Sequence, residues 1–199
     1  MGYTTDFAGK FNLNKPLDSE LLAYLLKFNE TRRMKRDLSH FVSKHTGQPI
    51  YGIDGEFFVG GEGFAGQERD GSVLDYNRPP STQPTLWCGW KPNDNGTAIE
   101  WDGVEKFHGY TMWIVYIIQN FLAPNGYILN GIVSWQGEHK EDFGDLIVED
   151  NVLKIKDHKN KDPYIFKSDL CKDQVASLLT CAIEQEVLQI EEKKYFRLD

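Results

Sequence analysis

The stretch FHGYTMWIVYIIQNFLAPNGYILNGIVSWQ, residues 107–136, predicts a buried helix followed by a strand. Its apolar side chains cover much of a helical circumference, which is typical of a helix that packs on several sides. These side chains belong to Phe107, Tyr110, Trp113, Ile114, Ile117, Ile118 and Phe121. We expect the helix to begin at Asp102, because Glu105 follows it at the spacing of a capping box. The Pro-Asn-Gly sequence at 124–126 ends it, and a strand follows at 127–136.

Shorter patterns on both sides of this stretch predict the rest of a sheet. Residues 7–13 alternate between apolar and polar side chains, as a strand with one buried face does. Asp18 is placed to cap a helix that continues to the basic cluster at 31–36. Further strands are expected at 86–90, 97–101, 146–149 and 152–156. This order of elements favours an α+β fold, a two-layer sandwich with a mainly antiparallel sheet and helices on one face.

Between residues 47 and 92 these patterns give way to a long irregular segment rich in Gly and Pro. Glycines are dense from 52 to 71, and prolines follow at 79, 80 and 84. A short strand at 56–59 is the one regular element that we expect there. Irregular segments of this length inside a compact domain tend to be functional, so this segment is the first place to look for a binding site.

A chain of 199 residues favours one domain with an appendage. We expect an α+β domain at 1–157. Residues 158–199 are expected to form a linker and an amphipathic C-terminal helix, which packs on the domain or at the interface of a homo-oligomer. The apolar stripe of this helix consists of Val175, Leu178, Leu179, Ala182, Ile183, Val187 and Ile190.

The net charge and the cysteine content limit the classes of partner and the cellular compartment that we expect for this chain. A net charge of −8 disfavours binding to a nucleic-acid backbone, which requires a basic face. The longest apolar run, 110–123, is too short to cross a bilayer, and the N-terminus lacks a signal-peptide pattern. Three cysteines form no CxxC pair, so we interpret them as reduced thiols. We therefore expect a cytoplasmic protein with neither a membrane nor a nucleic acid as partner.

Five short motifs resemble a family of proteins from bacteriophages and bacteria that has no assigned activity. They are Gly2-Tyr3-Thr4-Thr5-Asp6-Phe7, Arg32-Arg33-Met34-Lys35-Arg36, Asp75-Tyr76-Asn77-Arg78-Pro79-Pro80, Leu86-Trp87-Cys88 and Leu129-Asn130-Gly131. The resemblance covers roughly residues 2 to 156. It implies a phage or mobile-element origin, and hence the cytoplasm of a bacterial host cell, but it transfers no role to any residue.

Basic, glycine and aromatic residues in or near the irregular segment suggest a site for a small anion. Arginine forks pair with phosphate or carboxylate, a Gly-rich run can expose backbone N–H groups, and aromatic rings offer stacking surface. The ligand-binding residues that we predict are Arg32, Arg33, Arg36, Gly61, Gly63, Arg69, Tyr76, Arg78 and Trp87. The Gly-rich run, residues 60–66, lacks the Lys-Ser/Thr ending of a P-loop. As alternatives, the arginines complement a helix C-terminus, the glycines only provide flexibility, and the tryptophans belong to the core.

Acidic residues are the candidates for catalysis. Glu100, Glu138 and Asp142 carry carboxylates that could serve in acid–base chemistry, yet they lie among helix-capping and loop patterns. The chain has neither an HExxH motif nor a recognisable Cys/His nucleophile arrangement. We therefore predict no catalytic residues, no metal and no cofactor.

These observations favour a non-enzymatic, phage-type accessory protein that binds a small anionic, nucleotide-like ligand. Such a protein could sequester a signal of host defence. Two alternatives stay open at this point. One is an interaction or inhibitor protein that meets a host protein through its acidic surface or its C-terminal helix. The other is a carboxylate-dependent hydrolase or transferase.

Overall fold

The computed structural model describes residues 2–44, 46–60, 67, 70–157, 159 and 162–166. The expected C-terminal helix lies outside the described residues, as do three of the predicted ligand residues, Gly61, Gly63 and Arg69. Within the described part of the chain, no helix combines the length and the apolar character needed to span a bilayer.

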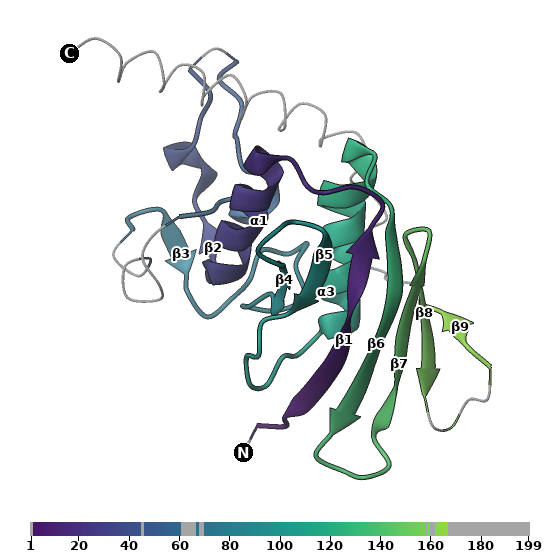
Figure 1. Cartoon of the computed structure of the whole chain (residues 1–199). Helices are drawn as coiled ribbons and strands as arrows, with labels where there is room; N and C mark the ends of the chain where they lie inside the picture. The colour runs from purple at the N-terminus through teal and green to yellow at the C-terminus, as the bar shows by residue number, and fades with distance from the viewer. Residues whose placement is uncertain are drawn as a thin grey trace.

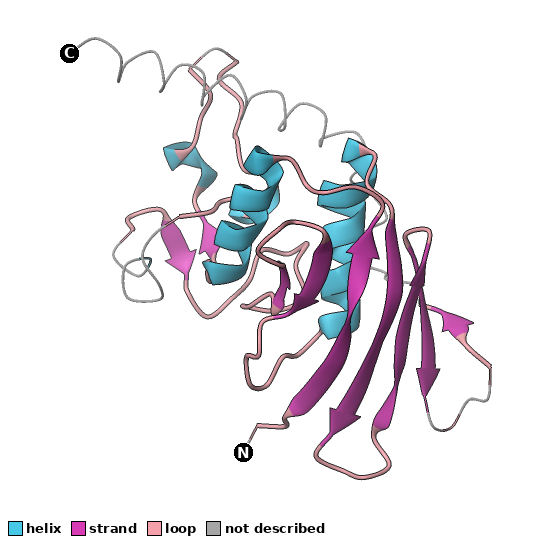
Figure 2. Ribbon diagram, in the orientation of Figure 1, coloured by secondary structure: helices cyan, strands magenta, loops and turns pink. Residues whose placement is uncertain are grey.

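The described residues form an antiparallel sheet of seven strands and two α-helices (Figures 1 and 2). The strand order is β4-β5-β1-β6-β7-β8-β9. The bounds are β1 Thr5–Leu13, β4 Trp90–Pro92, β5 Ala98–Trp101, β6 Leu129–Gly137, β7 Phe143–Glu149, β8 Val152–Asp157 and β9 Tyr164–Ile165. A second sheet pairs β2 (Lys35–Arg36) with β3 (Val73–Asp75). The expected α+β class with a mainly antiparallel sheet is confirmed.

The sheet has one core face and one exposed face, because side chains alternate along each strand. In β6, Val133 is fully buried while its neighbours Ile132 and Ser134 are exposed. In β1, Phe11 is fully buried while Lys10 is exposed. The alternation that predicted the first strand is therefore confirmed, and the core lies on one side of the sheet.

Both helices contribute to that core. Phe7 of β1 packs edge-on against Tyr110, with ring centroids 4.9 Å apart. Phe28 of the first helix meets Trp113 of the second at 5.9 Å. The expected burial of the second helix is confirmed for Trp113, Ile114, Ile117 and Phe121. Trp90 and Trp135 also lie in the core, as the core alternative for the tryptophans predicted.

The first helix, α1, spans Ser19–Glu30 and begins where predicted. Asp18 Oδ1 accepts a hydrogen bond from Leu21 N at 2.8 Å and so satisfies one N–H of the first turn. The helix ends at Glu30 because Thr31 adopts an extended backbone. The basic cluster at 31–36 therefore follows the helix as extended chain and is not a helical turn.

The second helix, α3, spans Tyr110–Ile117, and a π-helical turn at Ile118–Leu122 extends it. The predicted start at Asp102 is wrong. Lys106 and Gly109 have φ angles of 60° and 69°, in the left-handed region. A right-handed helix cannot run through such residues, so the helix begins only after them.

The irregular segment contains other elements than expected. The predicted strand at 56–59 is wrong, because a 3₁₀ turn at Ile53–Gly55 leads into a further turn instead. Glu56, the first residue of the predicted strand, has φ −56° and ψ −28°, a right-handed helical conformation rather than an extended one. β3 is a strand that the sequence pattern did not predict, and its Asp75 pairs with Lys35 of β2. The irregular segment is thus joined to the chain that leaves α1.

Candidate anion-binding site

The chain leaves α1 as an extended segment, residues 31–37, and the irregular segment holds it by backbone hydrogen bonds. Arg33 N donates to Leu86 O at 2.8 Å, for example. This arrangement places two cationic side chains in the interior. Arg33 is 1% exposed and Arg36 is 2% exposed. Arginine is almost never buried unless it is paired, so these two residues define the candidate site.

Arg33 is only partly paired. Its Nη2 donates a hydrogen bond to the carbonyl oxygen of Phe58, and its guanidinium carbon lies 4.2 Å from the centre of the Phe28 ring. Its Nε and Nη1 are buried and have no hydrogen-bond partner among the described residues. A buried N–H without a partner costs about 1 to 3 kcal/mol, so an acceptor at this position would stabilise the protein.

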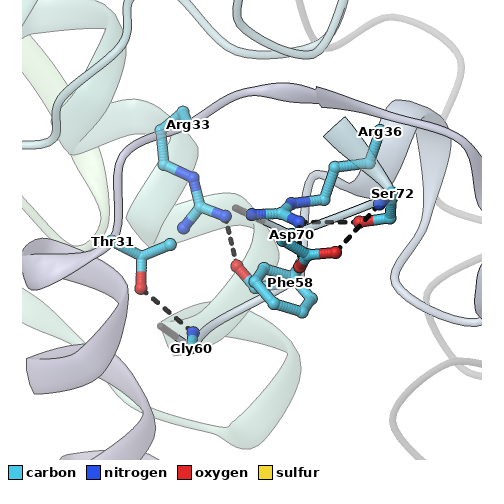
Figure 3. A network of polar contacts seen from close by, with 7 residues as sticks. All are labelled: Thr31, Arg33, Arg36, Phe58, Gly60, Asp70 and Ser72. Atoms are coloured by element: carbon cyan, nitrogen blue, oxygen red, sulfur yellow. Dashed lines mark hydrogen bonds and ion pairs between the residues drawn. The ribbon is translucent and has the colours of Figure 1, made fainter. Parts of the chain in front are cut away.

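Arg36 has a partner on one side of its guanidinium group. Its Nη1 donates to Asp70 Oδ2 at 2.6 Å and to Ser72 Oγ at 2.8 Å. Its guanidinium carbon lies 3.7 Å from the centre of the Phe58 ring. Its Nη2 is buried without a partner among the described residues. Figure 3 shows the guanidinium groups of Arg33 and Arg36 pointing toward one another.

The two arginines differ in how their charges are balanced. Asp70 pairs with Arg36, whereas no ion pair joins Arg33 to a carboxylate in the described part of the chain. Burial lowers the pKa of both guanidinium groups, and the charge of Arg36 lowers that of Arg33 further. Guanidinium nevertheless stays protonated in proteins, so a further anion beside Arg33 would be stabilised by its charge.

Glu56 lies in the same interior, at 1% exposure, but its oxygens are occupied. Oε2 accepts hydrogen bonds from the hydroxyls of Thr82 and Tyr116, and Oε1 accepts one from Ile53 N. Burial raises the pKa of Glu56, while these hydrogen bonds and the charge of Arg33 act in the opposite direction. A carboxylate with both oxygens engaged anchors the irregular segment rather than serving as a free base.

The two ends of the Gly-rich run lie beside the arginines. Gly60 N donates to Thr31 Oγ1 at 3.3 Å, at the start of the extended segment (Figure 3). Gln67 is 2% exposed, and its carbonyl oxygen accepts a hydrogen bond from Asp70 N. Both amide atoms of the Gln67 side chain are buried without a partner among the described residues. The chain thus enters and leaves the run next to buried side chains, those of the two arginines and of Gln67, that still have unpaired hydrogen-bonding atoms among the described residues.

The remaining predicted ligand residues lie elsewhere. Arg32 Nε donates to Tyr76 O at 2.9 Å, its Nη2 donates to Asn77 Oδ1 at 3.3 Å, and its guanidinium carbon lies 5.7 Å from the centre of the Trp87 ring. The structure therefore brings Arg32, Tyr76 and Trp87 together. Arg78 is exposed and lies beside a separate cleft, described below. The six predicted residues that the structure describes therefore do not form one cluster.

Sequence reasoning missed the groups that hold the arginines in place. Asp70 and Ser72 form part of an Asp-Gly-Ser sequence, which predicts a turn but not a partner for Arg36, 34 residues away. Glu56 and Gln67 stand in a run that shows no periodicity. Only long-range contacts identify these residues, and no local signal could have found them.

Two of the three acidic candidates for catalysis, Glu138 and Asp142, hold the N-terminal segment. Asp142 accepts hydrogen bonds from Tyr3 Oη at 2.6 Å and from Trp135 Nε1 at 3.3 Å. Glu138 Oε1 accepts one from Thr4 N at 2.8 Å. In the described part of the chain, no group of three or more His, Cys, Asp or Glu side chains could hold a metal ion. These carboxylates therefore have a structural explanation.

Fold and site together define an α+β chain whose interior carries two facing, incompletely paired arginines. Comparison with protein-family models, with curated protein sequences and with solved structures finds no match to this chain. The functional argument therefore rests on the geometry of the site.

Proposed function

We propose that this chain is a non-enzymatic accessory protein that binds a small anion between Arg33, Arg36 and the Gly-rich run. The class of ligand is a phosphate-bearing molecule such as a nucleotide, and the setting is the bacterial cytoplasm during phage infection. The observation that carries the proposal is the set of three buried guanidinium nitrogens, Arg33 Nε and Nη1 and Arg36 Nη2, that lack partners among the described residues.

The chemistry of guanidinium supports phosphate as the ligand. Two planar forks offer several N–H donors at fixed angles, which suits an anion with several oxygens. Charge-assisted hydrogen bonds contribute about 1.5 to 3 kcal/mol each when shielded from water. An anion would also offset the repulsion between the like charges of Arg33 and Arg36. Both arginines are at most 2% exposed, and the Phe28 and Phe58 rings lie against their guanidinium groups, so an anion bound there would be shielded from bulk water.

Thermal stability in the presence of named anions tests the proposal. The probes are inorganic phosphate, pyrophosphate, AMP and ATP, with sodium chloride at matched ionic strength as the salt control. A ligand at a hundred times its dissociation constant stabilises the folded state by about 2.7 kcal/mol. We expect at least one probe to raise the melting temperature of the wild type, and Arg33→Gln and Arg36→Gln to abolish the increase. Arg32→Gln, which alters a neighbouring arginine outside the site, should retain it.

Two further measurements separate this proposal from its alternatives. If Glu62→Gln or Glu68→Gln destabilises the ligand-free protein as much as Arg33→Gln does, a carboxylate of the chain itself neutralises the arginine and the proposal is wrong. Recovery of each nucleotide unchanged after incubation supports binding without catalysis, whereas turnover would identify an enzyme. Native mass spectrometry of protein purified from bacterial cells reports a retained anion and the number of subunits.

A further inference from the structure

A cleft beside the 3₁₀ turn at Ile53–Gly55 is lined by a different set of residues from the buried arginines. This cleft, of about 410 Å³, lies between β2 and the segment 78–83, and its lining includes Lys35, Asp54, Arg78 and Gln83. Its walls are held by backbone contacts, since Lys35 N donates to Arg78 O at 2.8 Å. Gly55 of the same turn lies close to the Arg36 side chain, since an added Cβ there would be 3.0 Å from Arg36 Cβ.

The rim of the cleft carries a net positive charge. Lys35 Nζ lies 3.7 Å from Asp54 Oδ1, so one lysine and one carboxylate offset each other. Asp54 Oδ2 also accepts a hydrogen bond from Ser81 N at 3.2 Å, which occupies the carboxylate further. Arg78, exposed at the same rim, adds a second cation. In a concave surface this balance favours an anionic group.

The floor of the cleft offers a hydrogen-bond acceptor. Gln83 is 3% exposed, and its Nε2 donates to the carbonyl oxygen of Glu56 at 2.7 Å and lies 3.0 Å from Tyr116 Oη. The Glu56 carbonyl can only accept, so the nitrogen of the amide must face it. That fixes the orientation of the side chain and leaves Gln83 Oε1, which is buried and has no partner among the described residues. A buried acceptor beside a cleft calls for an N–H or O–H donor from a ligand.

We propose that this cleft is a second ligand site, which takes a small anion that also carries an N–H or O–H donor. The anionic group contacts Lys35 and Arg78 at the rim, and the donor contacts Gln83 Oε1 at the floor. The volume fits a molecule of the size of a sugar phosphate or a hydroxy acid. The proposal does not require an anion at the buried arginines.

Titration calorimetry with two matched pairs of probes tests the cleft. Ribose 5-phosphate is compared with uncharged ribose, and malate is compared with succinate, which lacks its hydroxyl. We expect ribose 5-phosphate to bind at least ten times more tightly than ribose, or malate to bind at least ten times more tightly than succinate. Arg78→Gln and Lys35→Gln should each weaken that binding at least tenfold, and both variants should fold because the two side chains lie at the surface. Lys10→Gln, on the exposed face of the sheet, is the control that should bind as the wild type does.

Gln83→Met tests the floor of the cleft, because it keeps the length of the side chain and removes the acceptor. It should remove any preference for malate over succinate, which differ only in the hydroxyl donor, and should leave the preference for ribose 5-phosphate over ribose, which rests on charge; circular dichroism reports whether the variant is folded. The cleft proposal is overturned if neither ribose 5-phosphate nor malate binds, or if binding survives both Arg78→Gln and Lys35→Gln. If binding is instead lost with Arg36→Gln alone, the probe occupies the buried arginines, and only the cleft proposal fails. Binding that depends on Arg78 but not on Arg36 supports the cleft whatever the outcome for the first site.

Discussion

The guanidinium carbon of Arg36 lies 3.7 Å from the centre of the Phe58 ring, and the carbonyl oxygen of the same Phe58 accepts a hydrogen bond from Arg33. One residue of the irregular segment therefore contacts both buried cations, one through its ring and the other through its backbone. Phe58 holds the two guanidinium groups next to each other without supplying a negative charge. The irregular segment thus concentrates positive charge in the interior, which is the property that the proposed function uses.

Phe58→Leu should destabilise the protein by about 1 to 2 kcal/mol. Desolvated cation–π contacts contribute on the order of 2 kcal/mol, and leucine retains part of the packing. Urea denaturation followed by circular dichroism measures the change. Phe143→Leu is the matched control, because Phe143 is 46% exposed and its replacement should stay within about half a kcal/mol. Equal effects of the two substitutions would show that the contact between Arg36 and Phe58 contributes nothing.

Asp70→Asn should destabilise the protein at neutral pH and lose its effect in acid. Burial acts to raise the pKa of Asp70, but hydrogen bonds from Ser72 and the charge of Arg36 outweigh it, so the pKa lies below its ordinary value. A lowered folded-state pKa contributes stability above the unfolded-state pKa, and that stability disappears as the pH falls through the folded-state value. We expect a loss of about 1.5 to 3 kcal/mol at pH 7.

Denaturation at a series of pH values checks the Asp70 prediction. The difference between wild type and Asp70→Asn should be full at pH 7 and should shrink below about pH 4. Asp94→Asn, at an exposed turn, should show no such trend. A difference that stays constant across this range would mean that the charge of Asp70 is not what stabilises Arg36.

Ile117→Ala should cost about 2 to 5 kcal/mol, the usual range for removing a large aliphatic side chain from a core. Ile117 is 2% exposed in α3. Ile132→Ala gives the matched comparison, because the same residue type is 55% exposed on the outer face of β6 and its loss should change stability by less than about half a kcal/mol. Chemical denaturation of both variants measures the difference. Similar losses would contradict the assignment of a core face and an exposed face.

Gly131→Ala should destabilise the central pair of strands. Gly131 has a φ of 147°, and an added Cβ would lie 2.7 Å from the backbone oxygen of Lys10 on β1. The strained conformation alone costs about 1 to 3 kcal/mol, and the clash with a paired strand adds to it. Gly71→Ala, where nothing lies within 4 Å of the added atom, should have a small effect. Melting temperatures of the two variants decide the prediction, and an unaffected Gly131→Ala protein would refute it.

The sequence alone predicted those elements whose signals are local. The alternation in residues 7–13 marked a strand, and Asp18 was correctly identified as a helix cap. The strands expected at 146–149 and 152–156 leave Asp150 and Asn151 as the turn between them, and both adopt the positive φ angles that tight hairpins need. The central helix was predicted to be buried, because no surface helix is apolar around so much of its circumference.

Tertiary structure decided where the predicted site residues lie. Arg33 and Arg36 occur in a run that shows no preference for the interior, and only pairing of their segment with residues far along the chain buries them. The same contacts separate Arg78, which lies beside the cleft, from Arg32, which lies beside Trp87. Capping, turn formation and alternation depend on neighbours within a few residues, so they can be predicted from the sequence. Burial of a charge depends on which distant groups fold over it, and that information exists only in the assembled structure.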